Sequence, residues 1–282
     1  MKKNKLQPKM PLDAKNPNDV PDLSADDIIA GLRNDFWKKV LYFASVDSTN
    51  ELAMALSAEN AAVNGTVVIA DCQKRGRGRL GRKWVSPPGR NVYMSVILKT
   101  VMAPAEAVFL TVAASTACAV AIRNTTGLDV RIKWPNDLMV EGKKIGGILA
   151  ELRSHPAKSN FAVIGMGINV NSGIADFPEE LRGIATSVRE ESGKRFSRAP
   201  IIVEVLRELE NWYRTLINGE RPWLLKRWKE LSSTTGKKVI ITVGSETFSG
   251  LAVDIDEDGM LLVQLHSGDI RRISAGDLTE LR

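Results

Sequence analysis

The chain has 282 residues, with 39 Lys and Arg against 33 Asp and Glu, which gives a formal net charge of +6. This length predicts one large domain or two unequal ones. An apolar fraction of 44% with 26% charged residues excludes wholesale disorder and a fibrous chain. With two cysteines and two histidines, we expect neither a disulfide framework nor a zinc site or serine–histidine triad. The cysteine count favours a reduced, cytoplasmic setting.

The first 35 residues are predicted to form a flexible tail and a short helix. Residues 1–22 hold four of the twelve prolines and little aliphatic content, which is typical of a flexible tail. A helical pattern begins at Ser24, with Ile28, Ile29 and Leu32 on its apolar face. The basic start, MKKNK, is not followed by an apolar segment, so no signal peptide is expected.

Residues 36–233 are predicted to form the main domain, in which helices and strands are mixed. One helix follows Ser48 and Thr49, and a long alanine-rich helix covers residues 105–123. The apolar stretch of this second helix is shorter than 18 residues and contains hydroxyl side chains, which favours a buried helix over a membrane span. Strands are expected at residues 66–71, 91–99, 130–134, 137–140, 145–152 and 161–170, with a hairpin turn at Glu141 and Gly142.

The chain after Pro200 has the period of a helix. Apolar residues recur on one face from Ile201 to Leu216, and a second helix follows Pro222, a residue that suits a first turn. The tryptophans of these two helices are expected in the core: Trp212, Trp223 and Trp228.

Residues 234–282 change to short strands separated by turns that contain glycine. Strands are expected at residues 238–243, 246–254, 260–266 and 269–273, a spacing that predicts a small β-barrel domain. Residues 236–282 contain one aromatic residue, Phe248, so the aromatic groove with which SH3 modules bind proline-rich peptides is not expected.

The positive charge is concentrated in residues 73–90, which read QKRGRGRLGRKWVSPPGR. This segment carries seven Lys and Arg residues and no acidic residue, and the other 32 basic residues are balanced by 33 acidic ones. Glycines let a backbone approach an anion, and arginines donate paired hydrogen bonds to phosphate or carboxylate. We therefore expect a loop that is loose alone, because its charges repel, and that orders around an anionic ligand. A nucleic-acid-binding loop is the alternative.

Gly76, Gly78 and Gly81 in this segment match the G-x-G-x-x-G pattern of dinucleotide-binding proteins. That pattern must open a helix after a strand. Here Trp84 and then a pair of prolines follow the last glycine, and the prolines cannot continue a helix. The Gly-Lys-Ser/Thr ending of a P-loop is also missing from the segment, so neither nucleotide-binding fold is expected.

A second group of basic, small and amide residues lies between residues 133 and 171. Lys144 comes just before Gly147 at the start of a predicted strand, and the glycine leaves room for the lysine to reach a bound ligand. Gly165 and Asn169 repeat this theme at the end of the next strand. Each pattern alone is also compatible with a structural role.

Five segments in this order resemble the biotin protein ligase family. They are Ser48-Thr49-Asn50, Gln73 with GRGRLGRKW (76–84), KWPNDL (133–138), KKIGGILAE (143–151) and GMGINVN (165–171). The resemblance covers residues 40–282 and implies an α+β fold. It implies a catalytic domain with a mixed sheet flanked by helices, related to class II aminoacyl-tRNA synthetases, and a small C-terminal SH3-like β-barrel. It also implies a ligase that uses ATP and Mg²⁺ to form biotinyl-5′-adenylate and then biotinylates one lysine of a biotin carboxyl carrier protein.

The resemblance also implies roles for individual residues. Arg79 and Lys144 are the catalytic candidates because a carboxylate must meet the α-phosphate of ATP, and cations neutralise both anions. Asp137 is the third candidate, either for Mg²⁺ or for the proton of the attacking lysine, and the other metal ligands stay unknown. Trp84 is expected to cover the apolar arm or the adenylate. The binding set for biotin and its adenylate is Ser48, Thr49, Asn50, Gln73, Gly76, Arg77, Gly78, Arg79, Arg82, Trp84, Lys144, Gly147, Gly165 and Asn169.

Some members of this family carry an N-terminal winged helix and act as repressors. That unit needs more chain than the 35 residues before the expected catalytic domain, so binding to operator DNA is not expected. A lipoate or octanoate-protein ligase or transferase is the nearest alternative, although its glycine loop is not rich in arginine. A non-enzymatic nucleic-acid-binding protein is the alternative from another class. No membrane partner is expected, and a homodimer stays open.

Overall fold

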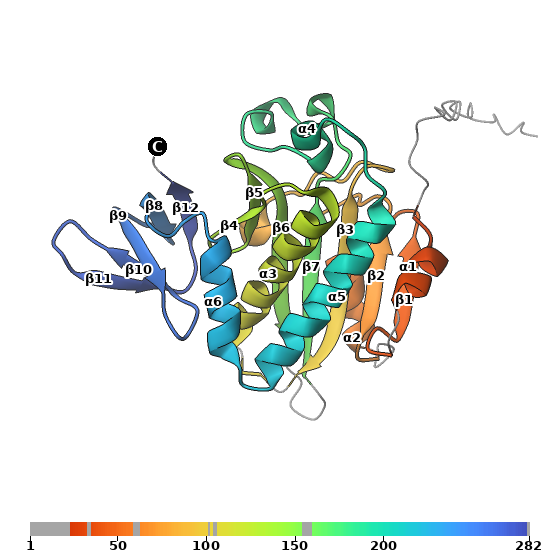
Figure 1. Cartoon of the computed structure of the whole chain (residues 1–282), viewed down its shortest axis with the longest axis horizontal. Helices are drawn as coiled ribbons and strands as arrows, with labels where there is room; N and C mark the ends of the chain where they lie inside the picture. The colour runs from red at the N-terminus through yellow and green to blue at the C-terminus, as the bar shows by residue number, and fades with distance from the viewer. Residues whose placement is uncertain are drawn as a thin grey trace, which may run out of the picture.

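The computed structural model describes residues 23–32, 35–58, 63–100, 102–103, 106–153 and 160–280. The tail expected at residues 1–22 lies outside the described residues. Two sheets organise the rest of the chain: a seven-stranded mixed sheet flanked by helices, and a five-stranded antiparallel sheet beside it (Figure 1). The expected fold class, a mixed sheet with helices followed by a small all-β unit, is therefore confirmed.

The larger sheet has the strand order β1-β2-β3-β7-β6-β5-β4, in which β1 and β2 are parallel and all other neighbours antiparallel. Strand β1 was not predicted from the sequence: it lies at the sheet edge, and its apolar run of four residues, Val40–Phe43, is too short to distinguish a strand from a helical segment by periodicity. The expected hairpin turn is confirmed, with positive φ at both Glu141 and Gly142. The strands are Lys39–Phe43 (β1), Thr66–Ala70 (β2), Val92–Thr100 (β3), Arg131–Lys133 (β4), Asp137–Val140 (β5), Lys143–Arg153 (β6) and Asn160–Ile168 (β7).

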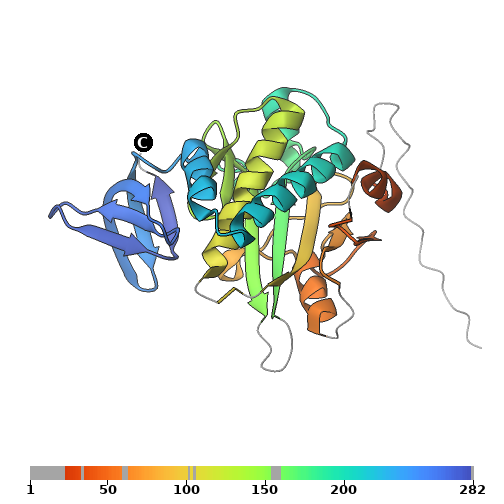
Figure 2. The same ribbon diagram turned by 60° about the horizontal axis from the view of Figure 1, so that its bottom comes forward.

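Helices cover the two faces of this sheet unequally. The long helices α3 and α5, with α6, lie on one face, and α2 lies on the other (Figure 2). Among the described residues, α3 is long and apolar enough to cross a membrane, but 67% of its most apolar window is buried inside the fold. It is the buried helix that its sequence predicts. The helices are Ala25–Gly31 (α1), Thr49–Ala58 (α2), Ala107–Thr126 (α3), Val188–Ser192 (α4), Arg198–Ile217 (α5) and Arg221–Leu231 (α6).

Alternate residues of each strand divide the interior into two parts. Met94 and Val96 of β3 point to the face covered by α3, where they join the main hydrophobic core. We call this side of the sheet the core face. Ser95 and Ile97 point the other way, and Ile97 packs with Ala53 of α2 in a much smaller cluster. This second side is called the site face, because its remaining area carries small and polar residues.

The expectation that all three helical tryptophans lie in the core is wrong for Trp223. Trp228 is fully buried and Trp212 partly buried, whereas Trp223 is 63% exposed. The buried residues of α6 recur at Leu224, Trp228 and Leu231, which is the spacing of one helical face. Trp223 lies one residue before Leu224 and therefore outside that face, and the Lys226 ammonium lies 5.3 Å from its ring centroid.

The small C-terminal sheet has the order β11-β10-β9-β8-β12 and shares the main hydrophobic core. The buried hydroxyl of Thr234 joins it to the larger sheet: it accepts a 3.0 Å hydrogen bond from the backbone N–H of Trp134 and donates one of 3.0 Å to Glu280. The last strand, which has only four residues, was not predicted from the sequence. The strands are Lys238–Val243 (β8), Glu246–Ile255 (β9), Leu261–Gln264 (β10), Ile270–Ile273 (β11) and Asp277–Glu280 (β12).

Candidate active site

The basic glycine-rich loop, residues 73–90, folds as a hairpin rather than as the start of a helix. The N–H of Gly78 donates to the carbonyl of Arg82 over 2.7 Å, and the N–H of Trp84 donates to the carbonyl of Gly76 over 2.9 Å. Between them lies one short 3-10 turn, Arg79–Gly81 (η1). The backbone therefore lacks the strand–turn–helix that a dinucleotide-binding G-x-G-x-x-G motif requires.

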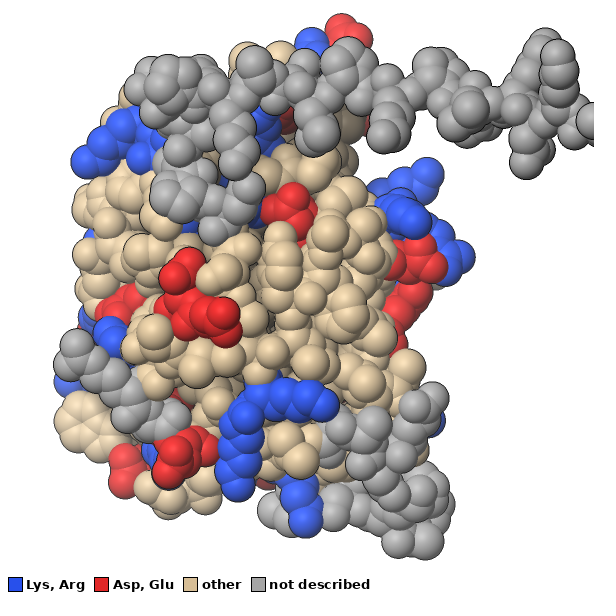
Figure 3. Space-filling view, turned by 90° about the vertical axis from the view of Figure 1, so that its right-hand side faces the viewer, with Lys and Arg blue, Asp and Glu red and all other residues tan. Residues whose placement is uncertain are grey.

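The cations of this loop are paired with carboxylates from distant parts of the chain. Arg75 pairs with Asp47 at 2.6 Å, and Arg77 pairs with Glu51 of α2 at 3.2 Å. Arg82 pairs with the carboxylate of Asp277 at the start of β12. These carboxylates offset the repulsion that the charge count predicts, and the fold brings them to the loop from other parts of the sequence. On the face in Figure 3, described basic and acidic side chains form small, separate groups.

A network of neutral groups lies on the site face around the start of α2. The Gln73 side-chain oxygen accepts hydrogen bonds from the N–H of Thr49 over 2.9 Å and from its hydroxyl over 3.2 Å. The Ser95 hydroxyl shares its one proton between the Thr49 hydroxyl, 2.8 Å away, and the side-chain oxygen of Asn50, 3.0 Å away. The Asn50 amide donates to Glu151 over 2.6 Å. These contacts leave each amide with one defined orientation.

Ser48, Thr49, Asn50 and Gln73 were predicted from the sequence as binding residues, whereas Ser95 and Glu151 were not. The hydroxyl of Ser48 caps α2 by accepting a 3.4 Å hydrogen bond from the N–H of Glu51. A serine in the middle of the apolar run of β3 was the available signal for Ser95, because a buried hydroxyl needs a partner.

Glycines of β6 and β7 form the floor beside this network. Gly147 and Gly167 face each other across the strand pair, and Gly165 lies opposite Ser95 on β3. A Cβ at Gly165 would lie 2.5 Å from the Asn50 side-chain oxygen, and one at Gly167 would lie 2.6 Å from the Trp84 ring. Only a residue without a side chain therefore lets Asn50 and the indole lie against the sheet.

Trp84 lies on this glycine floor with its polar atom unused. Its indole nitrogen is buried and has no hydrogen-bond partner among the described residues. A buried N–H without a partner costs free energy. The Lys144 ammonium lies 5.6 Å from the centroid of the same ring. The indole therefore offers an apolar ring face at the site, while its N–H is turned toward the glycine floor.

A β-bulge brings Lys144 to the site face. The register between β5 and β6 shifts between Leu138 and Met139, which leaves Ile145 without a partner. As a result, Lys144 points to the same side as Asp137, and its ammonium lies 2.5 Å from the Asp137 carboxylate. The backbone of Lys144 is held as well, because its N–H donates to Ile184 over 2.8 Å and its carbonyl accepts from Thr186 over 2.9 Å.

Arg79 reaches the same place from the loop. Its guanidinium donates a 2.9 Å hydrogen bond to the side-chain oxygen of Asn136, whose own amide donates to the Ile148 carbonyl over 2.8 Å. Burial lowers the pKa of Arg79, while the negative charges of Asp137 and Asp277 oppose that shift. The guanidinium and the Lys144 ammonium thus share Asp137 as a neighbour. Asn136 was not predicted as a site residue, although it lies in the KWPNDL segment.

Two of the expected site residues, Asn169 and Gly76, have structural roles next to the site. The Asn169 amide donates to the Thr186 carbonyl over 3.0 Å, beside the segment that holds Lys144. A Cβ at Gly76 would lie 2.4 Å from the Trp84 carbonyl, so this glycine permits the hairpin to close. Within the described residues, no group of three or more His, Cys, Asp and Glu side chains is placed to hold a metal ion.

Comparisons with known proteins identify two parts of the chain. Residues 42–169 match the biotin/lipoate A/B protein ligase family, and residues 234–278 match the biotin protein ligase C-terminal domain. The bifunctional ligase/repressor BirA of Bacillus spizizenii is 35% identical over 257 residues, which cover 91% of this chain and 78% of that protein. The biotin–[acetyl-CoA-carboxylase] ligase of Mycobacterium tuberculosis is 33% identical over 255 residues, which cover 87% and 90%.

A solved structure gives the same result for the fold. The biotin protein ligase from Aquifex aeolicus in complex with biotin and ATP matches with a TM-score of 0.74 at 29% identity. The match covers 87% of this chain and 99% of that chain.

Proposed function

The chain belongs to the biotin protein ligase family, and from this premise we propose that it attaches biotin to one lysine of a biotin carboxyl carrier protein. The reaction uses ATP and passes through biotinyl-5′-adenylate. One observation carries the proposal. A network of neutral amides and hydroxyls lies next to two cations, Arg79 and Lys144, over a floor of glycines. A neutral ring with an anionic tail fits such a surface.

The first step joins two anions. A biotin carboxylate oxygen attacks the α-phosphorus of ATP, a new O–P bond forms, and the bond to the pyrophosphate leaving group breaks. Arg79 and Lys144 are placed to stabilise the charge that builds up on the non-bridging oxygens. Their fixed contacts with Asn136 and Asp137 mean that little reorganisation is needed when the substrates meet.

Recognition of the neutral ureido ring is assigned to Thr49, Asn50, Gln73 and Ser95. These groups supply hydrogen bonds without charge, which suits a ligand that offers both N–H donors and a carbonyl acceptor. Trp84 supplies the apolar cover for the hydrocarbon arm or the adenylate, while its indole N–H is buried against the glycine floor. Closure of the loop over this space keeps water away from the mixed anhydride.

The second step transfers the acyl group. The amine of the acceptor lysine attacks the acyl carbon, an amide bond forms, and AMP leaves with the electrons of the broken C–O bond. The attacking nitrogen loses a proton, and Asp137 is the carboxylate proposed to accept it. Mg²⁺ enters with ATP as part of the substrate. This ion commonly takes one or two protein carboxylates beside phosphate oxygens and water, so Asp137 alone is compatible with it.

The matched family also contains lipoate enzymes, so the test includes both acids. The protein is incubated with Mg²⁺, ATP labelled at the α-phosphate, and either biotin or lipoate. We expect labelled biotinyl-adenylate and pyrophosphate with biotin, and neither product with lipoate. Lipoyl-adenylate without biotinyl-adenylate would contradict the proposal.

Two accompanying expectations concern where the protein acts and what else it binds. We place it in the cytoplasm, in agreement with the free thiols of Cys72 and Cys118. Operator DNA is not expected as a partner, although the Bacillus spizizenii relative is a bifunctional ligase/repressor. A gel shift with the promoter regions of biotin synthesis genes checks this, and salt-resistant, sequence-specific binding would contradict it.

A further inference from the structure

The basic loop begins and ends at one carboxylate outside it. Asp71 follows β2, two residues before the loop begins. One of its oxygens accepts a 2.7 Å hydrogen bond from the Arg198 guanidinium, and the other accepts a 2.9 Å bond from the N–H of Gly89. The same Arg198 nitrogen donates to the carbonyl of Asn91, 3.2 Å away. Asp71 and Arg198 therefore hold together the two ends of the loop.

The position of Arg198 makes this contact costly to lose. Its side chain is only 3% exposed, and it belongs to the first turn of α5, a long helix that packs against α3 in the core. A buried guanidinium is tolerated when it is paired, and removing one partner of such a pair leaves an uncompensated charge. The closed base of the loop is thus tied to a buried position on the helix pair α3 and α5.

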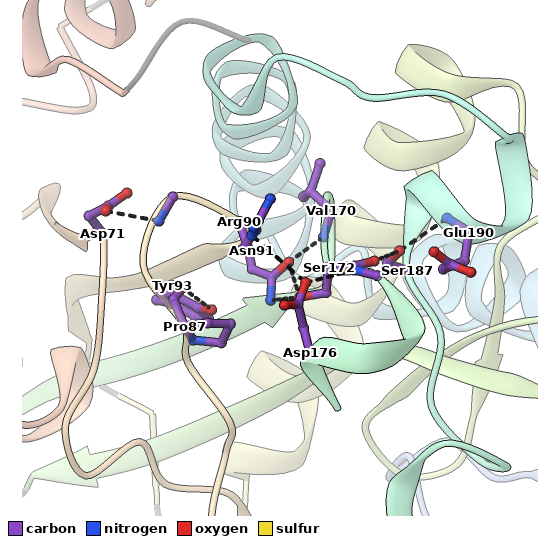
Figure 4. A network of polar contacts seen from close by, with 12 residues as sticks. Asp71, Pro87, Arg90, Asn91, Tyr93, Val170, Ser172, Asp176, Ser187 and Glu190 are labelled. Carbon is purple, nitrogen blue, oxygen red and sulfur yellow. Dashed lines mark hydrogen bonds and ion pairs between the residues drawn. The ribbon is translucent and has the colours of Figure 1, made fainter. Parts of the chain in front are cut away.

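A chain of buried polar groups continues from this base toward Lys144. The Asn91 side chain accepts from the N–H of Val170 over 3.0 Å and donates to Ser172 over 2.9 Å. The Ser187 hydroxyl donates to the carbonyl of Ser172 over 2.6 Å. Figure 4 shows Asn91 between the end of the loop and Ser172, with Ser187 beyond it.

This chain ends at the backbone of the proposed catalytic lysine. Ser187 directly follows Thr186, whose N–H donates to the Lys144 carbonyl over 2.9 Å. Asn91, Ser172 and Ser187 are all buried, so their hydrogen bonds do not compete with bulk water. One internal hydrogen-bond network therefore connects the loop that carries Arg79 with the strand that carries Lys144.

We propose that Asp71 and Arg198 are positioning residues for adenylate formation and retention, a role that rests on the proposed function. They touch no substrate. They hold the base of the loop closed, so that Arg79 and Trp84 stay over the glycine floor while biotinyl-adenylate waits for its acceptor. Loss of the pair leaves the network of Thr49, Asn50 and Gln73 in place but lets the loop open.

The test measures how long the whole protein retains biotinyl-adenylate. Labelled adenylate is formed on the enzyme and chased with unlabelled biotin and ATP. Wild type is compared with Arg198→Met, Arg198→Lys and Asp71→Asn. We expect release to be about tenfold faster in Arg198→Met and Asp71→Asn. Arg198→Lys keeps a charge for Asp71 and is expected to recover part of the retention time.

A matched control separates positioning from general loss of stability. Glu210→Gln alters another buried charge on α5, one that pairs with Arg214 at 2.9 Å and lies three turns from Arg198. We expect it to lower Tm without changing adenylate release. If Arg198→Met fails to fold, Asp71→Asn carries the test alone, because the Asp71 side chain is more exposed.

Each outcome bears on one claim. A wild type that forms no biotinyl-adenylate would overturn the proposed function, and the inference with it. Normal retention in Asp71→Asn, or in Arg198→Met, in a wild type that does form adenylate would overturn the inference alone. Equally fast release in Glu210→Gln would also overturn it, because the effect would then follow stability rather than loop closure.

Discussion

The two faces of the seven-stranded sheet use the same strands for opposite purposes. On the core face, Met94 and Val96 are fully buried against α3 and belong to the main hydrophobic core. One residue away, Ser95 points to the site face and joins the hydrogen bonds of Thr49 and Asn50. Because side chains alternate along a strand, one short segment supplies both the packing that holds the sheet and the floor on which the site is built.

The two faces also differ in what their residues contribute. Apolar burial stabilises a fold by about 25 cal/mol per Å², and that area lies mainly on the core face. The site face gives up such packing at Gly165 and Gly167, where a Cβ would press on Asn50 and Trp84 respectively. We therefore expect substitutions on the core face to change stability, and substitutions on the site face to change binding and rate.

The largest effect on the site face is expected at Lys144. Lys144→Met removes the ammonium beside Asp137 and keeps much of the side-chain volume, so adenylate formation should fall by about a thousandfold. Lys143→Met is the matched control, because this neighbouring lysine pairs with Glu191 at 3.6 Å instead of Asp137. We expect this variant to form adenylate at nearly the wild-type rate. Single-turnover pyrophosphate release measures both. Near-normal adenylation in Lys144→Met would remove this residue from the catalytic assignment.

Arg79 offers the next test, within one loop. Arg79→Ala removes the guanidinium that donates to Asn136, and we expect biotinyl-adenylate to leave the enzyme about tenfold faster or more. Arg75→Ala changes an arginine of the same loop whose side chain is 71% exposed and paired with Asp47, and it should release adenylate at the wild-type rate. Chase experiments on the preformed adenylate compare the two. Equal rates would mean that loop charge as a whole, rather than Arg79, retains the intermediate.

A pair of substitutions in β3 compares the faces directly. Met94→Ala leaves a cavity in the main core and should lower the free energy of unfolding by about 2–5 kcal/mol with little change in KM for biotin. Ser95→Ala should lower it by about 1 kcal/mol and raise KM for biotin about tenfold, because Thr49 and Asn50 lose their shared donor. Denaturant unfolding and steady-state kinetics give both quantities. A reversed pattern would contradict the division of the sheet into two faces.

The smallest expected effect is the reactivity of the two thiols. Cys118 lies in α3 on the core face, and burial raises its pKa to about 12, so at pH 8 it stays protonated and unreactive. Cys72 is half-buried and lies next to Gln73 at the start of the loop. Ellman's reagent should therefore modify one thiol in the folded protein, and biotin with ATP should slow that reaction. Prompt modification of both thiols would show that α3 does not protect the core face.

Much of this arrangement could be predicted from the sequence, because the local signals are strong. The five family segments, the long buried helix α3 and the turn at Glu141 all depend on residues close together in the chain. The contributions of Ser95 and Glu151 could not be predicted, since they depend on which strands pair and in which register. The bulge that turns Lys144 toward Asp137 is likewise a property of two strands together.

Charge shows the same limit. Counting along the chain places all of the surplus in residues 73–90, whereas the fold brings Asp47, Glu51 and Asp277 to the arginines of that loop. The exposure of Trp223 was also not predicted, because an apolar pattern at helical spacing locates the buried face of a helix only to within one position.

The central claim is that the site face carries out biotin ligation, and one measurement tests it most directly. The protein is mixed with biotin, Mg²⁺, ATP and a biotin carboxyl carrier domain, and the carrier is analysed by intact and peptide mass spectrometry. The account predicts a mass gain of one biotinyl group on a single lysine, which disappears when Lys144→Met replaces the wild type and persists with Lys143→Met. An unmodified carrier with the wild-type enzyme, or equal modification by Lys144→Met, would contradict it.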